Sequence, residues 1–149
     1  MVQVHPNSRN VIPGRVKFSM DLRNATDALV DQMADEVKAF AARKSQETGL
    51  DVKIEMVSSY SAIGFHADCI DAVARAAAKL GYSNMPVVSG AGHDAVYMAR
   101  LAPAGMIFIP CKDGISHNEI EDATPEHISA GCNVLLHAML GRAGVVSGA

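Results

Sequence analysis

The hydrophobic period of the chain changes twice within its first 60 residues, and this feature constrains the fold more than any other. Apolar residues alternate with polar ones over residues 16–22, recur every three or four residues over about 27–47, and alternate again over 50–56. Alternation is typical of a half-buried strand, and the longer spacing is typical of an amphipathic helix. The pattern predicts a strand, a helix and a second strand, and therefore the α/β fold class.

Short local signals mark the ends of these predicted elements. Pro13 and Gly14 favour a turn before the first strand. Thr26 is a typical N-cap, Asp27 suits the first helical turn, and Gly49 ends the helical pattern. Two parallel strands joined by one helix leave sheet edges uncovered, so we expect further strands from elsewhere or from a partner. Four residues should form the inner face of the helix: Leu29, Met33, Val37 and Phe40.

A second part of the chain follows a polar crossing segment at about residues 58–65. The periodicity there predicts a helix over 67–80, a buried strand at 86–88, a turn or two of helix over 94–101, a buried strand over 105–110, and a helix from Thr124 to about Gly141. The expected inner faces are Ile70, Val73, Ala74, Ala77 and Leu80 for the first helix, and Ile128, Cys132, Leu135 and Met139 for the last.

Composition narrows the class of protein. The 149 residues are 49% hydrophobic and carry a net charge of −3, so we expect a globular chain with a small ligand rather than a nucleic-acid or membrane partner. The first residues lack the pattern of a signal peptide, and no apolar run approaches the roughly 18 residues of a membrane span. Three widely spaced cysteines favour reduced, partly buried thiols. These features together predict a cytoplasmic location.

Two polar loops follow predicted strands, at residues 89–94 and 111–121. Ligands of α/β sheets usually bind where such loops gather. Glycines in the first loop would let the backbone approach an anion or an oxyanion, although a tight strand-to-helix turn explains them equally well. His93 beside Asp94 could bind a ligand or transfer a proton, but the side chains of adjacent residues point in different directions. Helix capping by Asp94 is therefore the favoured interpretation.

His117 is the strongest metal-ligand candidate, because it lies among Ser, Asn and Glu in the second loop and could offer a neutral imidazole nitrogen. A catalytic zinc needs about three protein ligands. The sequence contains no His-Glu-x-x-His pattern, no Cys-x-x-Cys pair and no acidic cluster near another histidine, so the residues by themselves offer at most part of a site. Solvated or capping roles are expected for the remaining histidines: His5, His66, His127 and His137.

A candidate binding pair lies on either side of the predicted Pro-Gly turn and consists of Asn10 and Arg23. A guanidinium can hold a carboxylate with two hydrogen bonds, and a nearby amide can add a third. A surface arginine beside a solvated asparagine is the alternative interpretation, and spacing alone favours it.

Three segments of the sequence contain the candidate site residues. They are Pro6-Asn7-Ser8-Arg9-Asn10-Val11-Ile12-Pro13-Gly14 running into Asp21-Leu22-Arg23, then Ser89-Gly90-Ala91-Gly92-His93-Asp94-Ala95, and Gly114-Ile115-Ser116-His117-Asn118. Together these segments resemble the amidase branch of the aminoacylase-like metallohydrolases, which contains N-carbamoyl-L-amino-acid hydrolases, β-ureidopropionases and allantoate amidohydrolases. The match covers nearly the whole chain in the family's order and spacing.

The resemblance implies part of a two-domain metallohydrolase. Residues 1–60 would be the second half of an α/β lid, which also forms a homodimer, and residues 61–149 the C-terminal part of an α/β catalytic domain. The reaction implied is hydrolysis of the ureido or amide C–N bond of N-carbamoyl-L-amino acids, β-ureido acids or allantoate. The implied cofactor is a pair of divalent metal ions, Zn²⁺ or Mn²⁺.

The resemblance also implies roles residue by residue. Asn10 and Arg23 would hold the substrate carboxylate, Gly92 and His93 would complete substrate binding, and His117 would be the last metal ligand. The other metal ligands and the general-base Glu of the family lie upstream and have no counterpart here. The chain alone is therefore expected to be inactive, as a truncated protein, a split-gene fragment or a remnant.

Two alternatives remain open at this point. The first is a non-catalytic dimerisation or ligand-binding remnant that kept the lid and the carboxylate clamp. The second is a related aminoacylase or dipeptidase, against which the Gly-His-Asp string argues.

Overall fold

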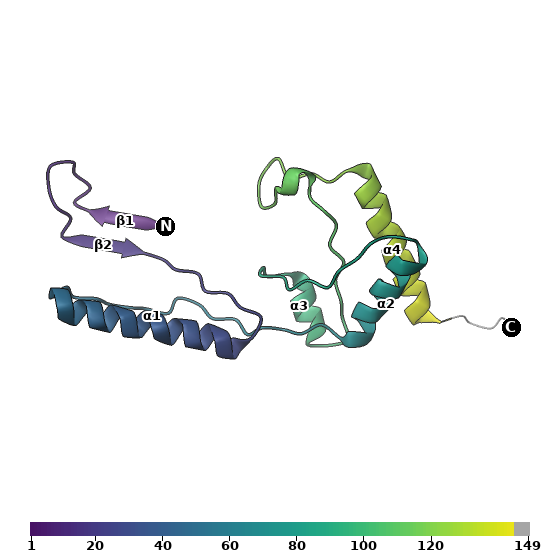
Figure 1. Ribbon diagram of the computed structural model, residues 1–149, viewed down its shortest axis with the longest axis horizontal. Helices are drawn as coiled ribbons and strands as arrows, with labels where there is room; N and C mark the ends of the chain where they lie inside the picture. The colour runs from purple at the N-terminus through teal and green to yellow at the C-terminus, as the bar shows by residue number, and fades with distance from the viewer. Residues whose placement is uncertain (145–149) are drawn as a thin grey trace. The chain divides into compact units, whose positions relative to one another are not determined.

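The computed structural model describes residues 1–144 and has a mixed α/β composition, as predicted (Figure 1). Its chain divides into two compact units, the first spanning Met1–Ala62 and the second beginning at Ile63. The roles expected for residues 1–60 and 61–149, lid and catalytic domain, stay predictions.

The first unit opens with a hairpin of two short antiparallel strands, β1 (Val2–His5) and β2 (Arg15–Phe18). Val2 pairs with Phe18, and the Gly14 N–H closes the connecting loop by donating to the His5 carbonyl at 3.0 Å. The strand predicted over 16–22 therefore ends sooner than expected. Its partner β1 was not predicted, although Val2 and Val4 alternate with polar residues in the required way.

Helix α1 (Asp27–Thr48) has the predicted bounds and caps. The Leu29 N–H donates to Thr26 Oγ1 at 3.4 Å, which satisfies one of the free donors of the first turn. Gly49 ends the helix in the left-handed conformation, with φ of 72°, which glycine adopts without steric cost.

The inner face of α1 is only partly the predicted one. Met33 and Val37 are half-buried as expected, but Leu29 and Phe40 are 44% and 53% exposed. The Phe40 ring instead lies under the Arg43 guanidinium, 5.2 Å from its centroid. The face that is half-buried is therefore rotated relative to the predicted stripe. Its members are Val30, Met33, Ala34, Val37, Ala41 and Ser45.

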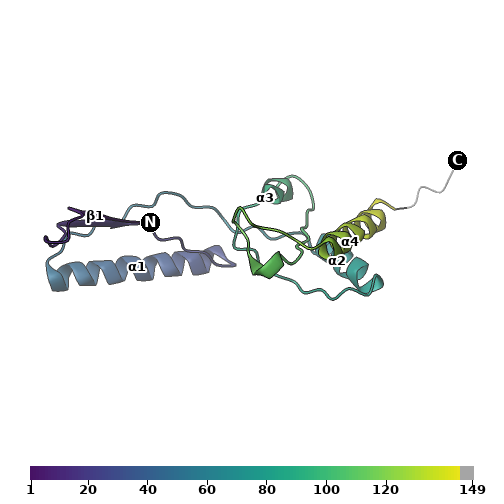
Figure 2. The ribbon, with the colours of Figure 1, turned by 90° about the horizontal axis from the view of Figure 1, so that it is seen from above.

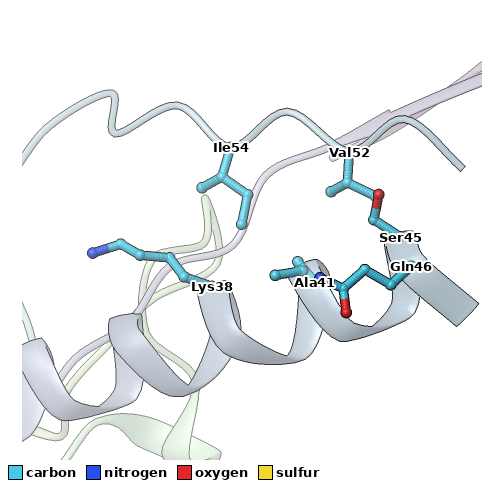
Figure 3. Close-up of a pocket in the computed structure, with 7 residues that line it drawn as sticks. Lys38, Ala41, Ser45, Gln46, Val52 and Ile54 are labelled. Carbon is cyan, nitrogen blue, oxygen red and sulfur yellow. The ribbon is translucent and has the colours of Figure 1, made fainter.

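The second strand predicted for this unit, over residues 50–56, does not form. Instead the segment is a non-helical stretch that pairs with no described strand, and the only described sheet is the antiparallel β1–β2 pair. The predicted parallel arrangement is therefore wrong, because a strand needs a hydrogen-bonding neighbour and none of the described strands supplies one. Val52 and Ile54 line a hollow of about 370 Å³ with α1 residues (Figure 3). Those helix residues are Lys38, Ala41, Ala42, Ser45 and Gln46.

The second unit is built on two helices, α2 (Ala67–Lys79) and α4 (Pro125–Ala143), which lie side by side in both ribbon views (Figures 1 and 2). Between them in sequence come the short helix α3 (Asp94–Ala99) and a 3₁₀ turn, η1 (Lys112–Gly114). The buried core is one small cluster from α2 and α4: Ala72, Ala76, Ala77, Val134 and Ala138.

Both long helices of this unit have caps that the sequence indicated. The His66 imidazole caps α2 by accepting from the Asp68 N–H at 3.2 Å, which confirms a capping role for this histidine. Thr124 Oγ1 accepts from the His127 N–H at 3.3 Å, and proline occupies the first turn of α4. Three members of the predicted α2 face pack in or against the core, Val73, Ala77 and Leu80. Ala74 is half-buried, and Ile70 is exposed.

The predicted inner face of α4 is wrong. Ile128, Leu135 and Met139 are 47%, 50% and 60% exposed, and Cys132 is exposed as well. The buried positions of α4 are Val134 and Ala138, on a stripe turned by about a third of the helix circumference from the predicted one. Apolar residues surround most of α4, so periodicity cannot select one face, and such a helix is typical of the interior of a larger domain.

The strands predicted at 86–88 and 105–110 do not form ladders either. The second of these segments nevertheless runs close to both long helices. A Cβ on Gly105 would lie 3.0 Å from Cys69 Cβ, and a Cβ on Gly131 would lie 2.6 Å from Ile109 Cγ2. The segment therefore packs as the buried run that the sequence indicates, without a neighbouring strand among the described residues.

Two smaller expectations concern thiols and membranes. Cys69 and Cys111 are half-buried free thiols as expected, whereas Cys132 is an exposed one. None of the described helices is both long and apolar enough to cross a bilayer.

Candidate functional site

The predicted site residues come from both units. Asn10 lies in the β1–β2 loop and Arg23 lies between β2 and α1. Gly92 and His93 lie in the loop before α3, and His117 lies in the loop between η1 and α4.

The Arg23 guanidinium donates hydrogen bonds to both oxygens of the Asp21 carboxylate, two residues earlier in the chain. Arg23 Nε donates to both carboxylate oxygens, at 3.0 and 3.1 Å, and Nη2 donates to Asp21 Oδ2. Both side chains face solvent, with exposed fractions of 60% and 65%. The geometry shows that this arginine can bind a carboxylate through several hydrogen bonds, in the manner that the clamp hypothesis requires.

The pair also changes how each group titrates. The hydrogen bond from Arg23 lowers the pKa of Asp21, with a smaller contribution from the positive charge. The same hydrogen bond raises the pKa of Arg23 further above its ordinary value. Any carboxylate ligand of Arg23 must therefore share the guanidinium with Asp21 or displace it. Sequence reasoning missed Asp21, although its position two residues before Arg23 was visible.

Asn10 is exposed, and its backbone N–H donates to Ser8 Oγ at 3.3 Å. Its side-chain amide has no hydrogen-bond partner among residues 1–144, so it is available to an incoming ligand. The joint clamp of Asn10 and Arg23 stays a prediction.

The loop before α3 is organised around Ser89. The Ser89 hydroxyl lies 2.7 Å from His93 Nε2 and accepts a hydrogen bond from the Ala91 N–H at 3.2 Å. The His93 ring also meets Phe108 edge-on, with 5.5 Å between centroids and 63° between planes. The half-buried imidazole is therefore fixed by two independent contacts.

The expected capping role of Asp94 is wrong, because His93 occupies the N-cap position of α3 and Asp94 is the first helical residue. Its carboxylate still suits the first turn of a helix. Gly92 is exposed, and a Cβ there would meet no atom within 4 Å. The space above Gly92 is thus open to a ligand.

The second loop holds His117 in an uncommon backbone conformation. Its φ is 56°, in the left-handed region that few residues other than glycine adopt. The His117 N–H donates to Glu121 Oε2 at 2.7 Å, and this carboxylate stabilises the conformation. Residues held in this region cluster at functional sites, which makes the loop a candidate on geometric grounds. Sequence reasoning had not singled out Glu121.

The described residues do not form a metal centre by themselves. No group of three or more His, Cys, Asp or Glu side chains within residues 1–144 is placed to hold a metal ion. The exposed His117 imidazole could contribute at most one ligand. No metal-dependent step follows from this part of the chain alone.

His127 departs from the surface role expected for it. The residue is half-buried in α4, and its Nδ1 is shut off from solvent without a hydrogen-bond partner among the described residues. An unsatisfied nitrogen of this kind is unusual in a folded protein, and it lies on a helix whose apolar faces are largely uncovered.

Comparison with known proteins identifies the family. The sequence matches the model of peptidase family M20/M25/M40 over residues 5–141. The chain therefore belongs to this family of hydrolases.

Several of the similar proteins are named for an enzymatic activity. An N-carbamoyl-L-amino-acid amidohydrolase of Rhizobium meliloti is 45% identical over 141 residues, which cover 95% of this chain and 34% of that protein. An allantoate amidohydrolase of Bacillus subtilis is 31% identical, over 90% of this chain and 32% of that protein.

A solved structure is also similar to nearly the whole chain. An amidase of the hydantoinase/carbamoylase family from Burkholderia multivorans superposes with a TM-score of 0.93 at 55% identity, over 96% of this chain and 35% of that one. The chain thus spans about a third of the length of the relatives it matches.

Proposed function

We propose that this chain forms the substrate-binding and lid part of a metal-dependent amidohydrolase. The substrates proposed are N-carbamoyl-L-amino acids, β-ureido acids or allantoate, whose ureido or amide C–N bond is hydrolysed. The observation that carries the proposal is the 45% identity to an N-carbamoyl-L-amino-acid amidohydrolase over 95% of this chain. The loop geometry around His93 and His117 supports it.

The two units would have different roles in the enzyme. Residues 1–60 would belong to the lid and supply a homodimer interface, and residues 61–149 would end the catalytic domain. The exposed apolar faces of α1 and α4 support this division, because each helix has a side that nothing described here covers. The cytoplasm is the proposed location.

Within the site, Arg23 would bind the substrate carboxylate and Asn10 would add a hydrogen bond. The forked contact with Asp21 supports this role, since the guanidinium already donates to both oxygens of a carboxylate. Gly92 would leave room for the substrate, and His93 would donate to it.

His117 would supply one ligand to a pair of Zn²⁺ or Mn²⁺ ions. Its exposed imidazole and the backbone held by Glu121 support this assignment. The remaining ligands and the general-base Glu would come from parts of the protein outside this chain. The residues described here would bind and orient the substrate, and they would not generate the nucleophile.

A chimera tests the proposal directly. Residues 5–141 replace the matching third of the R. meliloti enzyme, and hydrolysis of an N-carbamoyl-L-amino acid, a β-ureido acid and allantoate is measured with metal content. We expect hydrolysis of at least one substrate and about two divalent ions per site. A folded, metal-loaded chimera that hydrolyses none of the three would contradict the proposal.

The same chimera carrying Arg23→Ala is the matched variant. Loss of the guanidinium should raise KM about a hundredfold for carboxylated substrates, because charge-assisted bidentate contacts are among the strongest hydrogen bonds. Arg9→Ala, which changes an exposed arginine of the β1–β2 loop, serves as the control and should leave KM unchanged.

The second candidate function is a non-catalytic dimerisation or ligand-binding module. The Arg23 fork favours it, because this contact holds a carboxylate without a metal ion. Metal analysis and native mass spectrometry of the chimera separate the two, since this alternative predicts a dimer that binds no stoichiometric metal, whereas the proposed enzyme needs about two divalent ions per site.

A further inference from the structure

The hydrogen bonds around Ser89 favour one position for the proton of His93. A serine hydroxyl has one proton to donate and two lone pairs with which to accept. One lone pair of Ser89 Oγ already accepts from the Ala91 N–H at 3.2 Å. The hydroxyl proton is therefore free to point at His93 Nε2, which lies 2.7 Å away.

The opposite assignment satisfies fewer groups. If His93 Nε2 carried the proton, Ser89 Oγ would accept two hydrogen bonds, and its own proton would have no acceptor among the described residues. With the proton on the hydroxyl, both the serine and Nε2 are satisfied. Neutral imidazole carries a single N–H, so that proton must then be on Nδ1.

The rest of the ring environment is compatible with this tautomer. Phe108 meets the His93 ring edge-on and offers no hydrogen-bonding group that would favour either nitrogen. Nδ1 has no hydrogen-bond partner among residues 1–144. The ring is thus held at one nitrogen and by Phe108, and it presents a donor at the other nitrogen.

The geometry points to Ser89 as a positioning residue that holds His93 in its Nδ1–H tautomer, leaving Nδ1 as a hydrogen-bond donor for an oxygen of the ligand. The ligand oxygen would be a carbonyl or carboxylate oxygen, and this part of the inference rests on the proposed function. The tautomer itself does not, because it follows from the loop alone. Gly92, with open space beside it, leaves room for the ligand.

Nitrogen NMR of the imidazole rings tests the tautomer without any substrate. The 149-residue chain labelled with ¹⁵N is compared with Ser89→Ala and Ser89→Thr, and His93→Gln identifies the His93 signals among those of six histidines. We expect the Nδ1–H form to predominate in the parent chain at a pH where the ring is neutral. It should be lost in Ser89→Ala and restored in Ser89→Thr, which keeps the hydroxyl.

Ser8→Ala is the matched control. Ser8 also accepts a backbone N–H two residues on, from Asn10 at 3.3 Å, but it makes this contact within its own loop, so the His93 signals should not change. A parent chain with His93 mainly in the Nε2–H form, which dominates in free histidine, would overturn the assignment. An unchanged tautomer in Ser89→Ala would overturn it equally, because the hydroxyl would then have no influence.

The ligand part is tested in the chimera with N-carbamoylglycine. Saturation should shift the His93 Nδ1 resonance, and Ser89→Ala should raise KM about tenfold with a smaller change in kcat. An unshifted resonance in an active chimera would overturn the donor role. An inactive chimera contradicts the proposed function instead, while the tautomer measured in the chain alone is unaffected.

Discussion

The two units of the chain differ in how they are held together. The five buried core residues found within residues 1–144 all belong to the second unit, where α2 packs on α4. The first unit contains a hairpin and a longer helix, α1, yet none of the residues of α1 is buried. Local sequence signals can therefore be enough to define a helix or a hairpin. A buried core also requires a second layer of secondary structure against which that helix or hairpin packs.

The largest effect should come from placing a charge in the core of the second unit. Ala77 is 3% exposed, so Ala77→Asp buries an unpaired carboxylate and should destabilise this unit by roughly 3 kcal/mol or more. Hydrogen exchange should show loss of protection in α2 and α4. Protection of α1 should not change, and a simultaneous loss there would show that the two units unfold together.

The control for this experiment is the next residue. Ala78 lies on the same helix and is exposed, so Ala78→Asp should cost only about 1 kcal/mol, from the lower helix propensity of Asp and its negative charge in the last turn. Equal losses in the two variants would show that α2 does not pack as described.

Two glycines of α4 should respond to alanine with opposite signs. A Cβ at Gly131 would lie 2.6 Å from Ile109 Cγ2, so Gly131→Ala should destabilise by about 1–3 kcal/mol. A Cβ at Gly141 would meet nothing within 4 Å, so Gly141→Ala should stabilise by about 0.5–1 kcal/mol through helix propensity. Thermal unfolding of the two variants measures both effects.

Shortening the Ile109 side chain should relieve its steric clash with a Cβ at position 131. Ile109→Ala combined with Gly131→Ala should cost less than the sum of the two single changes. Additive costs would mean that residues 105–110 do not pass against α4.

Equivalent caps in the two units allow a third comparison. Thr26→Ala and Thr124→Ala each remove a hydroxyl that accepts a first-turn N–H, at 3.4 and 3.3 Å, and each should cost about 1 kcal/mol of helix stability. We expect greater fraying at the start of α1, because no buried residue holds that helix. Amide exchange at the first turn of each helix gives the measurement, and greater fraying in α4 would reverse the comparison.

The smallest effect concerns the exposed Asp21–Arg23 pair. The hydrogen bond from Arg23 lowers the pKa of Asp21, so whatever stability the pair contributes is present above the ordinary carboxyl pKa and is lost as the pH falls through the lowered value. NMR titration of the Asp21 carboxyl should give a midpoint below the ordinary carboxyl pKa, returning toward that ordinary pKa in Arg23→Ala. An unshifted midpoint in the parent chain would show that the fork does not persist in solution.

Local signals predicted the helices well and the strands poorly. The caps at Thr26, His66 and Thr124 are contacts within one turn, so a short stretch of sequence contains everything they need. The runs at 50–56 and 105–110 have the alternation or apolarity of strands, but a strand also needs a neighbour. The periodicity therefore identified segments with strand-like composition and could not supply their partners.

The candidate site, like the fold, was predicted only in part from the sequence. The sequence indicated which loops to inspect and, through family resemblance, which residues in them to name. It did not show that Ser89 contacts His93, that Asp21 occupies the Arg23 fork, or that Glu121 holds the His117 backbone. Each of these contacts joins residues two to four positions apart, and it depends on loop dihedral angles that residue types alone do not determine.

The amino-acid sequence by itself determined the family of this protein, the positions of its helices and their caps, because these depend on residue identity and on interactions within a turn. Only the tertiary structure decided which face of α4 is buried, which apolar runs find strand partners, and how His93 and His117 are held. The first two outcomes depend on the free energy of packing between segments distant in the chain, because an apolar residue packs equally well against many partners until the fold selects one. The last depends on loop dihedral angles that residue types alone do not determine.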